Sequence, residues 1–176
     1  FYLQLVEVAL EILRTRRMSA ADIRRRVSVV NPQLLREYSN DFQQPVIVLA
    51  IHQGNWEWML HGVKLHLDIP IDPVYKPLHN KTLDRLMLER CLWLPFLNRE
   101  AAFYEGGESI ATMTGHPVLF AQCRRRARGY YEVEFREVAK PPYRRGEHRI
   151  TARYAELAEA AIRSEPQSWL WSNRRW

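Results

Sequence analysis

The chain has 176 residues, 47% of them hydrophobic, and its 26 lysines and arginines exceed its 20 aspartates and glutamates. This length and composition predict one globular domain with a real core and exclude a disordered chain. The net charge of +6 suits an anionic partner, and a solvated basic surface is an equal alternative. Cys91 and Cys123 lack C-x-x-C spacing, which argues against a disulfide framework or a structural zinc site.

The pattern of residues 1–44 predicts an N-terminal helical part. The first helix, residues 1–17, has apolar side chains at helical spacing, at Leu3, Val6, Leu10 and Leu13. Ser19 is a candidate N-cap for a second, arginine-rich helix, and a third is expected from Pro32 towards Tyr38.

Residues 45–176 are predicted to form an α/β core, a parallel or mixed sheet flanked by helices. The run "QQPVIVLAI" at 43–51 is typical of a strand buried on both faces. The elements expected after it are a helix at 56–67, a strand at 71–77, helices at 80–92 and 106–115, strands at 116–123 and 129–138, and a helix at 149–164. Residues 168–176 form either a last strand or a basic tail.

The junction at residues 92 and 93 is unusual. The helix expected at 80–92 would run directly into "WLPFLNREAAF", with no turn residue before Pro95. We therefore expect a segment to be missing there.

The run "VIVLAIHQGNWEWML", residues 46–60, places two ionisable side chains between a strand and a helix. If the whole run were helical, His52 and Glu57 would point about 140° apart. If His52 ends the strand and Asn55 caps the following helix, a turn at Gly54 can bring them together. Glu57 then lies in the first helical turn, where the helix dipole favours a carboxylate. Open α/β sheets also bind ligands at the C-terminal ends of their strands.

Such a pair suits general-base catalysis, because the imidazole takes a proton while the carboxylate orients it. On chemistry alone, a histidine that only bonds locally at the strand end is slightly favoured, since H-x4-E is a short pattern. His61 and His66 suggest a metal site on the same helix, but they miss a common face and no H-E-x-x-H motif is present. No catalytic metal is expected.

Other segments carry a longer pattern. They are "PVIVLAIHQGNWEW", "VYKPLHN", "LPFLNREAAFYEGGESIATMTGHPVLF" and "PQSWLWSNRRW", in that order along the chain. In this order they resemble the conserved blocks of the bacterial lipid A biosynthesis acyltransferases, the lauroyl and myristoyl transferases with an H-x4-[DE] motif. The resemblance extends from about residue 19 to residue 176.

The sequence also departs from that family. Lys76 stands where arginine is usual, Phe103 and Glu105 stand where threonines are common, and Asn173 replaces a histidine. Several tens of residues that the family has near positions 91–93 are absent, which agrees with the unusual junction.

The resemblance implies O-acyl transfer from acyl carrier protein or acyl-CoA to a hydroxyl of a lipid A precursor or related glycolipid. His52 would deprotonate the hydroxyl, Glu57 would orient His52, and the acyl thioester would be a co-substrate with no cofactor. Asn55 would chiefly shape the turn. The other residues expected to meet substrate are Lys76, Arg90, Arg99, Arg174 and Arg175, with Arg90 a candidate oxyanion donor.

The resemblance also implies an anionic membrane surface as partner, at the cytoplasmic face of the bacterial inner membrane. Because the chain opens at Phe1 within a helical pattern, an anchor is expected upstream of it. The arginine runs at 24–26 and 124–126 would contact the membrane or an acidic carrier protein.

Two alternatives stay open. One is an acyltransferase of the same architecture acting on another membrane lipid. The other is a basic module that docks on anionic lipid or nucleic acid and catalyses nothing. No nucleic-acid reading motif is present, so we expect no nucleic-acid partner.

Overall fold

The computed structural model describes residues 2–73 and 91–171. Its helices are α1 Tyr2–Thr15, α2 Ala20–Arg26, α3 Pro32–Tyr38, α4 Trp56–Leu67, α6 Gly106–Thr114, α7 Arg149–Ser164 and the 3-10 turn η1 Pro166–Ser168. Its strands are β1 Val27–Val29, β2 Ile47–Ala50, β3 Cys91–Phe96, β4 Arg99–Tyr104, β5 Val118–Ala127 and β6 Tyr130–Ala139.

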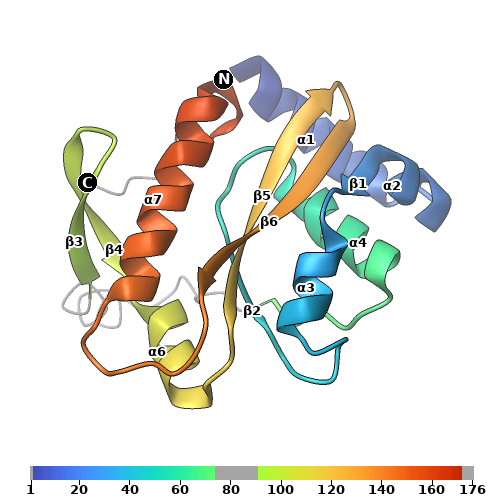
Figure 1. Ribbon diagram of the computed structural model, residues 1–176. Coiled ribbons are helices and arrows are strands. Elements are labelled where there is room, and N and C mark those ends of the chain that lie inside the picture. The colour runs from blue at the N-terminus through green and yellow to red at the C-terminus, as the bar shows by residue number, and fades with distance from the viewer. Residues whose placement is uncertain (1, 74–90, 172–176) are drawn as a thin grey trace, which may run out of the picture.

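The main sheet has the order β1-β6-β5-β2, and helices flank it on both sides (Figure 1). The long strands β5 and β6 pair antiparallel in the middle, while β1 and β2 pair parallel to β6 and β5. This mixed sheet between helices confirms the α/β class. Strands β3 and β4 form a separate antiparallel hairpin that packs on α7.

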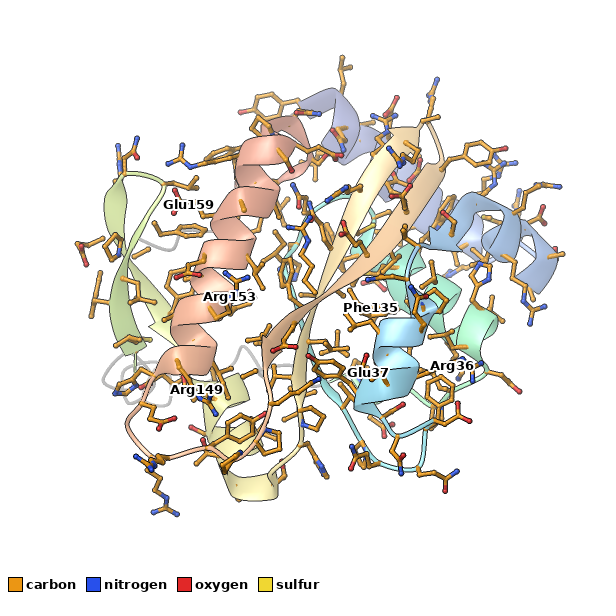
Figure 2. The ribbon with its side chains drawn as sticks, viewed as in Figure 1. Arg36, Glu37, Phe135, Arg149, Arg153 and Glu159 are labelled. Atoms are coloured by element: carbon orange, nitrogen blue, oxygen red, sulfur yellow. The ribbon has the colours of Figure 1, made fainter. Side chains whose placement is uncertain are left out.

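Alternate side chains of β5 point into two cores, as the pleat of a strand dictates. Val118 and Phe120 pack with the apolar face of α7 and with the β3–β4 hairpin. Leu119 and Ala121 pack on the opposite face of the sheet, with side chains from α2, α3 and α4. Helix α7 turns its charged side outward, where Figure 2 labels Arg149, Arg153 and Glu159.

Most expected elements are confirmed. The helices predicted at the N-terminus correspond to α1, α2 and α3, and Ser19 caps α2 in a capping box with Asp22. Helix α4 and helix α7 have the predicted bounds, and Gly115 closes α6 with a φ of 69°. No helix within the described residues is both long enough and apolar enough to cross a bilayer.

Three expectations about secondary structure are wrong in part. Strand β2 is half exposed rather than buried on both faces, because it lies at the edge of the sheet, and Val48 is 42% exposed. The helix predicted to reach residue 92 does not, since Cys91 begins β3. Residues 71–73 form no strand, and the rest of the predicted strand lies outside the described residues. The β3–β4 hairpin and β1 were not predicted at all.

Leu92 and Trp93 are successive residues of β3, paired with Phe103 and Ala102 of β4. A missing segment at this point stays a prediction, as does a division of the chain at residue 45. In the C-terminal segment, Trp169 forms an isolated antiparallel bridge with Gln53. The described part of this segment therefore pairs with the junction between β2 and α4.

Candidate active site

The candidate site is the junction between β2 and α4, residues 51–57. The backbone of this junction is held by the last residue of η1 and by the segment that follows it. The amide of Leu170 donates to the carbonyl of His52 at 3.1 Å, and the amide of Gly54 donates to the carbonyl of Ser168 at 3.0 Å. The buried side chain of Gln53 donates to the carbonyl of Ala161 at 2.9 Å, which ties the same turn to α7.

Gly54 is required by the geometry of this turn. Its φ is +62°, in the left-handed region that favours glycine. A Cβ at this position would lie 2.9 Å from the carbonyl oxygen of Cys123 on β5. The turn therefore packs directly on the central sheet, and the expectation of a glycine-dependent turn is confirmed.

Asn55 caps α4, as predicted from the sequence. Its Oδ1 accepts a hydrogen bond from the amide of Trp58 at 3.0 Å. Its Nδ2 donates to Oε2 of Glu11 on α1 at 2.9 Å. Because Asn55 is fully buried and both ends of its amide are bonded within the protein, it shapes the turn. A direct contact with substrate stays a prediction.

His52 and Glu57 are both exposed, at opposite ends of this buried turn. The imidazole of His52 packs edge-on against the indole of Trp56, with ring centroids 5.1 Å apart. Glu57 lies in the first turn of α4, where the helix dipole favours its carboxylate. The turn thus presents both side chains to solvent, and the bond between them stays a prediction.

A second set of residues, on α1, forms hydrogen bonds with the turn and with the residues packed against it. They lie on one face of α1, at Gln4, Glu11 and Thr15. The Nε2 of Gln4 donates to Oγ of Ser168 at 2.8 Å, and Oγ1 of Thr15 accepts from the indole nitrogen of Trp58 at 2.7 Å. Glu11 bonds Asn55 and also accepts from the hydroxyl of Tyr131 at 2.7 Å.

Sequence reasoning missed this set. Its signal was a polar stripe at positions 4, 7, 11 and 15, which has the spacing of one helix face. The buried surroundings of the stripe change the acidity of its neighbours. Burial, followed by the hydrogen bond to Glu11, raises the pKa of Tyr131. Burial likewise raises the pKa of Cys123, beneath the turn, to about 12.

Thr15→Val should lower the free energy of unfolding by about 1–2 kcal/mol, because it leaves the indole N–H of Trp58 buried without an acceptor. Trp58 is 1% exposed, so water cannot easily replace the threonine. Thermal unfolding measures the loss. The matched control is Thr114→Val on α6, whose hydroxyl is exposed and also bonds the carbonyl four residues earlier. Equal melting temperatures for the two variants would contradict this account.

The remaining predicted substrate residues are not gathered at the junction by the described structure. Arg99 begins β4 and is exposed. Lys76, Arg90, Arg174 and Arg175 lie outside the described residues, so their roles stay predictions.

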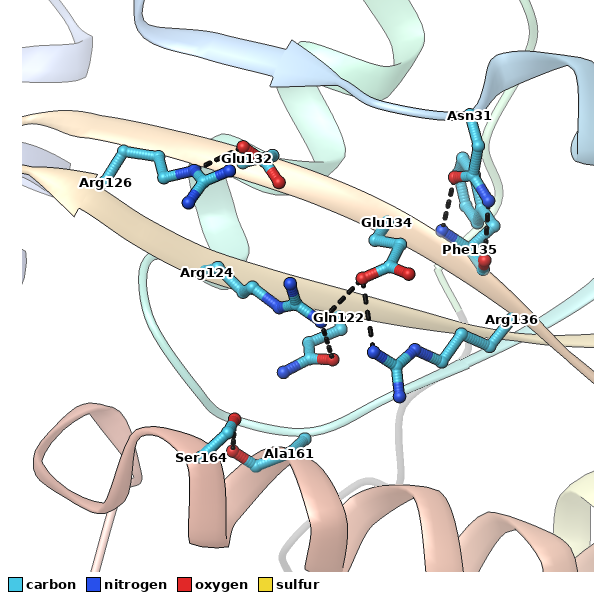
Figure 3. Close-up of polar contacts among 10 residues, drawn as sticks. All are labelled: Asn31, Gln122, Arg124, Arg126, Glu132, Glu134, Phe135, Arg136, Ala161 and Ser164. Carbon is cyan, nitrogen blue, oxygen red and sulfur yellow. Dashed lines mark hydrogen bonds and ion pairs between the residues drawn. The ribbon is translucent and has the colours of Figure 1, made fainter.

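The arginine run at 124–126 is largely engaged within the protein. Arg124 pairs with Glu134 at 2.6 Å, Arg125 with Glu7, and Arg126 with Glu132. Figure 3 shows the Arg124 and Arg126 pairs across β5 and β6. A membrane or carrier protein would therefore compete with internal glutamates for this run, and such a contact stays a prediction.

One group of possible metal ligands was not predicted. Glu105, Glu108 and His148 place ligand atoms within 4.8 Å of one another. The bonds among the described residues account for them. Oε2 of Glu108 accepts from the amide and hydroxyl of Thr151 in the first turn of α7, and Glu105 contacts His148. Of the histidines on α4, His66 bonds the carbonyl of Val27 at 2.6 Å.

Comparison with known protein families gives a match. The family model described as bacterial lipid A biosynthesis acyltransferase matches residues 89–176, half of the chain (88 of 176 residues). The match covers the segment from β3 to the C-terminus, and the junction at 51–57 precedes it. No curated protein matches the chain.

Proposed function

The chain belongs to the bacterial lipid A biosynthesis acyltransferase family, and from this we propose that it transfers a fatty acyl chain from a thioester to a lipid hydroxyl at the β2–α4 junction. The donor is acyl carrier protein or coenzyme A carrying the chain, and the acceptor is a lipid A precursor or related glycolipid. The site of action is the cytoplasmic face of the bacterial inner membrane.

One observation carries the proposal. An exposed histidine and an exposed carboxylate flank a turn whose own residues, Gln53, Gly54 and Asn55, are all buried. A buried turn whose backbone and whose Asn55 side chain are hydrogen-bonded within the protein keeps the two exposed side chains in a fixed relation, which is what acid–base catalysis requires. His52 is not needed as a cap for α4, because the buried Asn55 already caps that helix.

The proposed reaction follows from these groups. His52 accepts the proton of the acceptor hydroxyl as its oxygen attacks the thioester carbonyl. The carbon–sulfur bond then breaks, and the thiolate leaves with the proton that His52 held. Glu57 supports the imidazolium that forms between these steps. The tetrahedral oxyanion needs hydrogen-bond donors, and Arg90 is the proposed one.

The direct test is transfer of a labelled acyl chain to lipid. The purified protein is given acyl carrier protein or coenzyme A charged with the chain, together with a glycolipid acceptor bearing a free hydroxyl. We expect labelled lipid and free thiol in equal amounts. If thiol is released without acylated lipid, the protein is a thioesterase on this donor. If neither product forms with any donor and acceptor of this class, the proposed function is wrong.

A further inference from the structure

Helix α1 has an inverted amphipathic arrangement. The side chains that it turns towards the protein are mostly polar, as Gln4, Glu11 and Thr15 show. Most of its apolar side chains face outward instead, although Val8 is buried. The most exposed are Tyr2 at 79%, Leu3 at 85%, Val6 at 58%, Leu10 at 57% and Leu13 at 68%. A helix that faced water on this side would carry the opposite pattern.

The charges around this outer row are of one sign. Both acidic residues of α1 lie on its inner side, where Glu7 pairs with Arg125 and Arg128 and Glu11 bonds Asn55. At the C-terminal end of the row, three exposed arginines follow within four positions, at Arg14, Arg16 and Arg17. The exposed face of α1 is therefore apolar, free of acids and bordered by cations.

A hollow of about 290 Å³ lies beside the same row. Its charged lining is mixed, with Arg14, Arg26 and Arg128 beside the carboxylates of Glu7 and Glu11, and Leu10 and Trp58 line its apolar part. An apolar row that ends at the exposed side chains of Arg14, Arg16 and Arg17 matches a bilayer, which offers acyl chains and anionic headgroups at adjacent depths.

We propose that α1 is an interfacial helix that lies flat in an anionic bilayer surface, with its outer row in the acyl region and its arginines at the headgroups. The inner side of the same helix holds the turn of His52 and Glu57 through Asn55 and Ser168. A membrane bound to α1 would thus lie directly behind the candidate active site. This inference assigns the membrane contact of the proposed acyltransferase to α1. Its biological role rests on the proposed function, but the binding of α1 to a bilayer does not.

Co-sedimentation with vesicles tests the proposal without any acyl donor. The vesicles are phosphatidylcholine alone, or phosphatidylcholine and phosphatidylglycerol in equal parts. We expect the protein to bind the anionic vesicles more tightly, and salt to weaken that binding. Changing Leu10→Gln together with Leu13→Gln should lower the partition coefficient about tenfold or more, because two leucines lose their burial in the bilayer. Each of Arg14→Gln and Arg17→Gln should lower it about fivefold on anionic vesicles.

The matched control is Val30→Gln with Met113→Gln, two apolar side chains that are 52% and 78% exposed away from α1. This control should bind vesicles as the unchanged protein does. Equal binding by the leucine variant would overturn the proposal. The proposal would also be overturned if the unchanged protein were a dimer that the leucine substitutions dissociate, and if neither protein bound vesicles. His52→Ala should bind vesicles normally, so a failure of the catalytic proposal would leave this result intact.

Discussion

His52→Ala should reduce the rate of acyl transfer about 10²–10⁴-fold, because an alcohol is a poor nucleophile at neutral pH without a positioned base. The same change should leave the free energy of unfolding within about 0.5 kcal/mol of the starting value, since the side chain is exposed. Initial rates of acylated lipid formation and a thermal melt measure the two quantities on one preparation.

The control for this prediction is His61→Ala. His61 is also exposed, and it lies on α4, the helix that carries Glu57. Its removal should change neither rate nor melting temperature. If His61→Ala slowed transfer as much as His52→Ala, the effect would not be specific to His52, and the assignment of His52 as the base would be contradicted.

Asn55→Asp should lower the free energy of unfolding by about 3 kcal/mol. The new carboxylate keeps the oxygen that caps α4 through the amide of Trp58. It loses the Nδ2 donor and sets a second negative charge 2.9 Å from Oε2 of Glu11, at a position with no exposure. Chemical denaturation gives the loss directly.

A second substitution separates this cause from a general intolerance of position 55. Adding Glu11→Gln should recover at least about 1 kcal/mol of the loss, because its amide can donate to the new carboxylate. Glu11→Gln alone should cost little, since its oxygen still accepts from Asn55. If the losses of unfolding free energy from Asn55→Asp and Glu11→Gln simply add in the double variant, the bond between Glu11 and Asn55 does not account for the cost of Asn55→Asp.

Local signals predicted much of the fold. The N-cap at Ser19, the glycine that closes α6 and the long helix at 149–164 were each predicted from the residues of the element itself, and each element was found where expected. The turn at Gly54 and the cap at Asn55 were predictable for the same reason. Their signals are short, and the geometry that they specify is local.

The β3–β4 hairpin was missed because its turn carries no usual signal. The two residues between the paired strands, Leu97 and Asn98, have φ angles of 52° and 64°. Asparagine tolerates this conformation, but leucine rarely adopts it. Leu97 packs against the core cluster that includes α7, so a contact distant in sequence holds the turn. The residues near the turn do not indicate this distant contact.

The supporting face of α1 was missed for a related reason. Its partners are 44 positions away in the case of Glu11 and Asn55, and 164 in the case of Gln4 and Ser168. The polar stripe was visible in the sequence, but which side of the helix turns inward depends on those distant partners. The position of β2 at the sheet edge likewise depends on the order of strands and not on its own residues.

The central claim is that His52 and Glu57 act as one catalytic unit. The most direct measurement compares acyl-transfer rates of the unchanged protein, His52→Ala, Glu57→Gln and the double variant. Residues that act as a unit have non-additive effects. We predict that Glu57→Gln slows transfer and that the double variant is no slower than His52→Ala. Losses that multiply in the double variant, or a Glu57→Gln protein that transfers at the unchanged rate, would contradict the account.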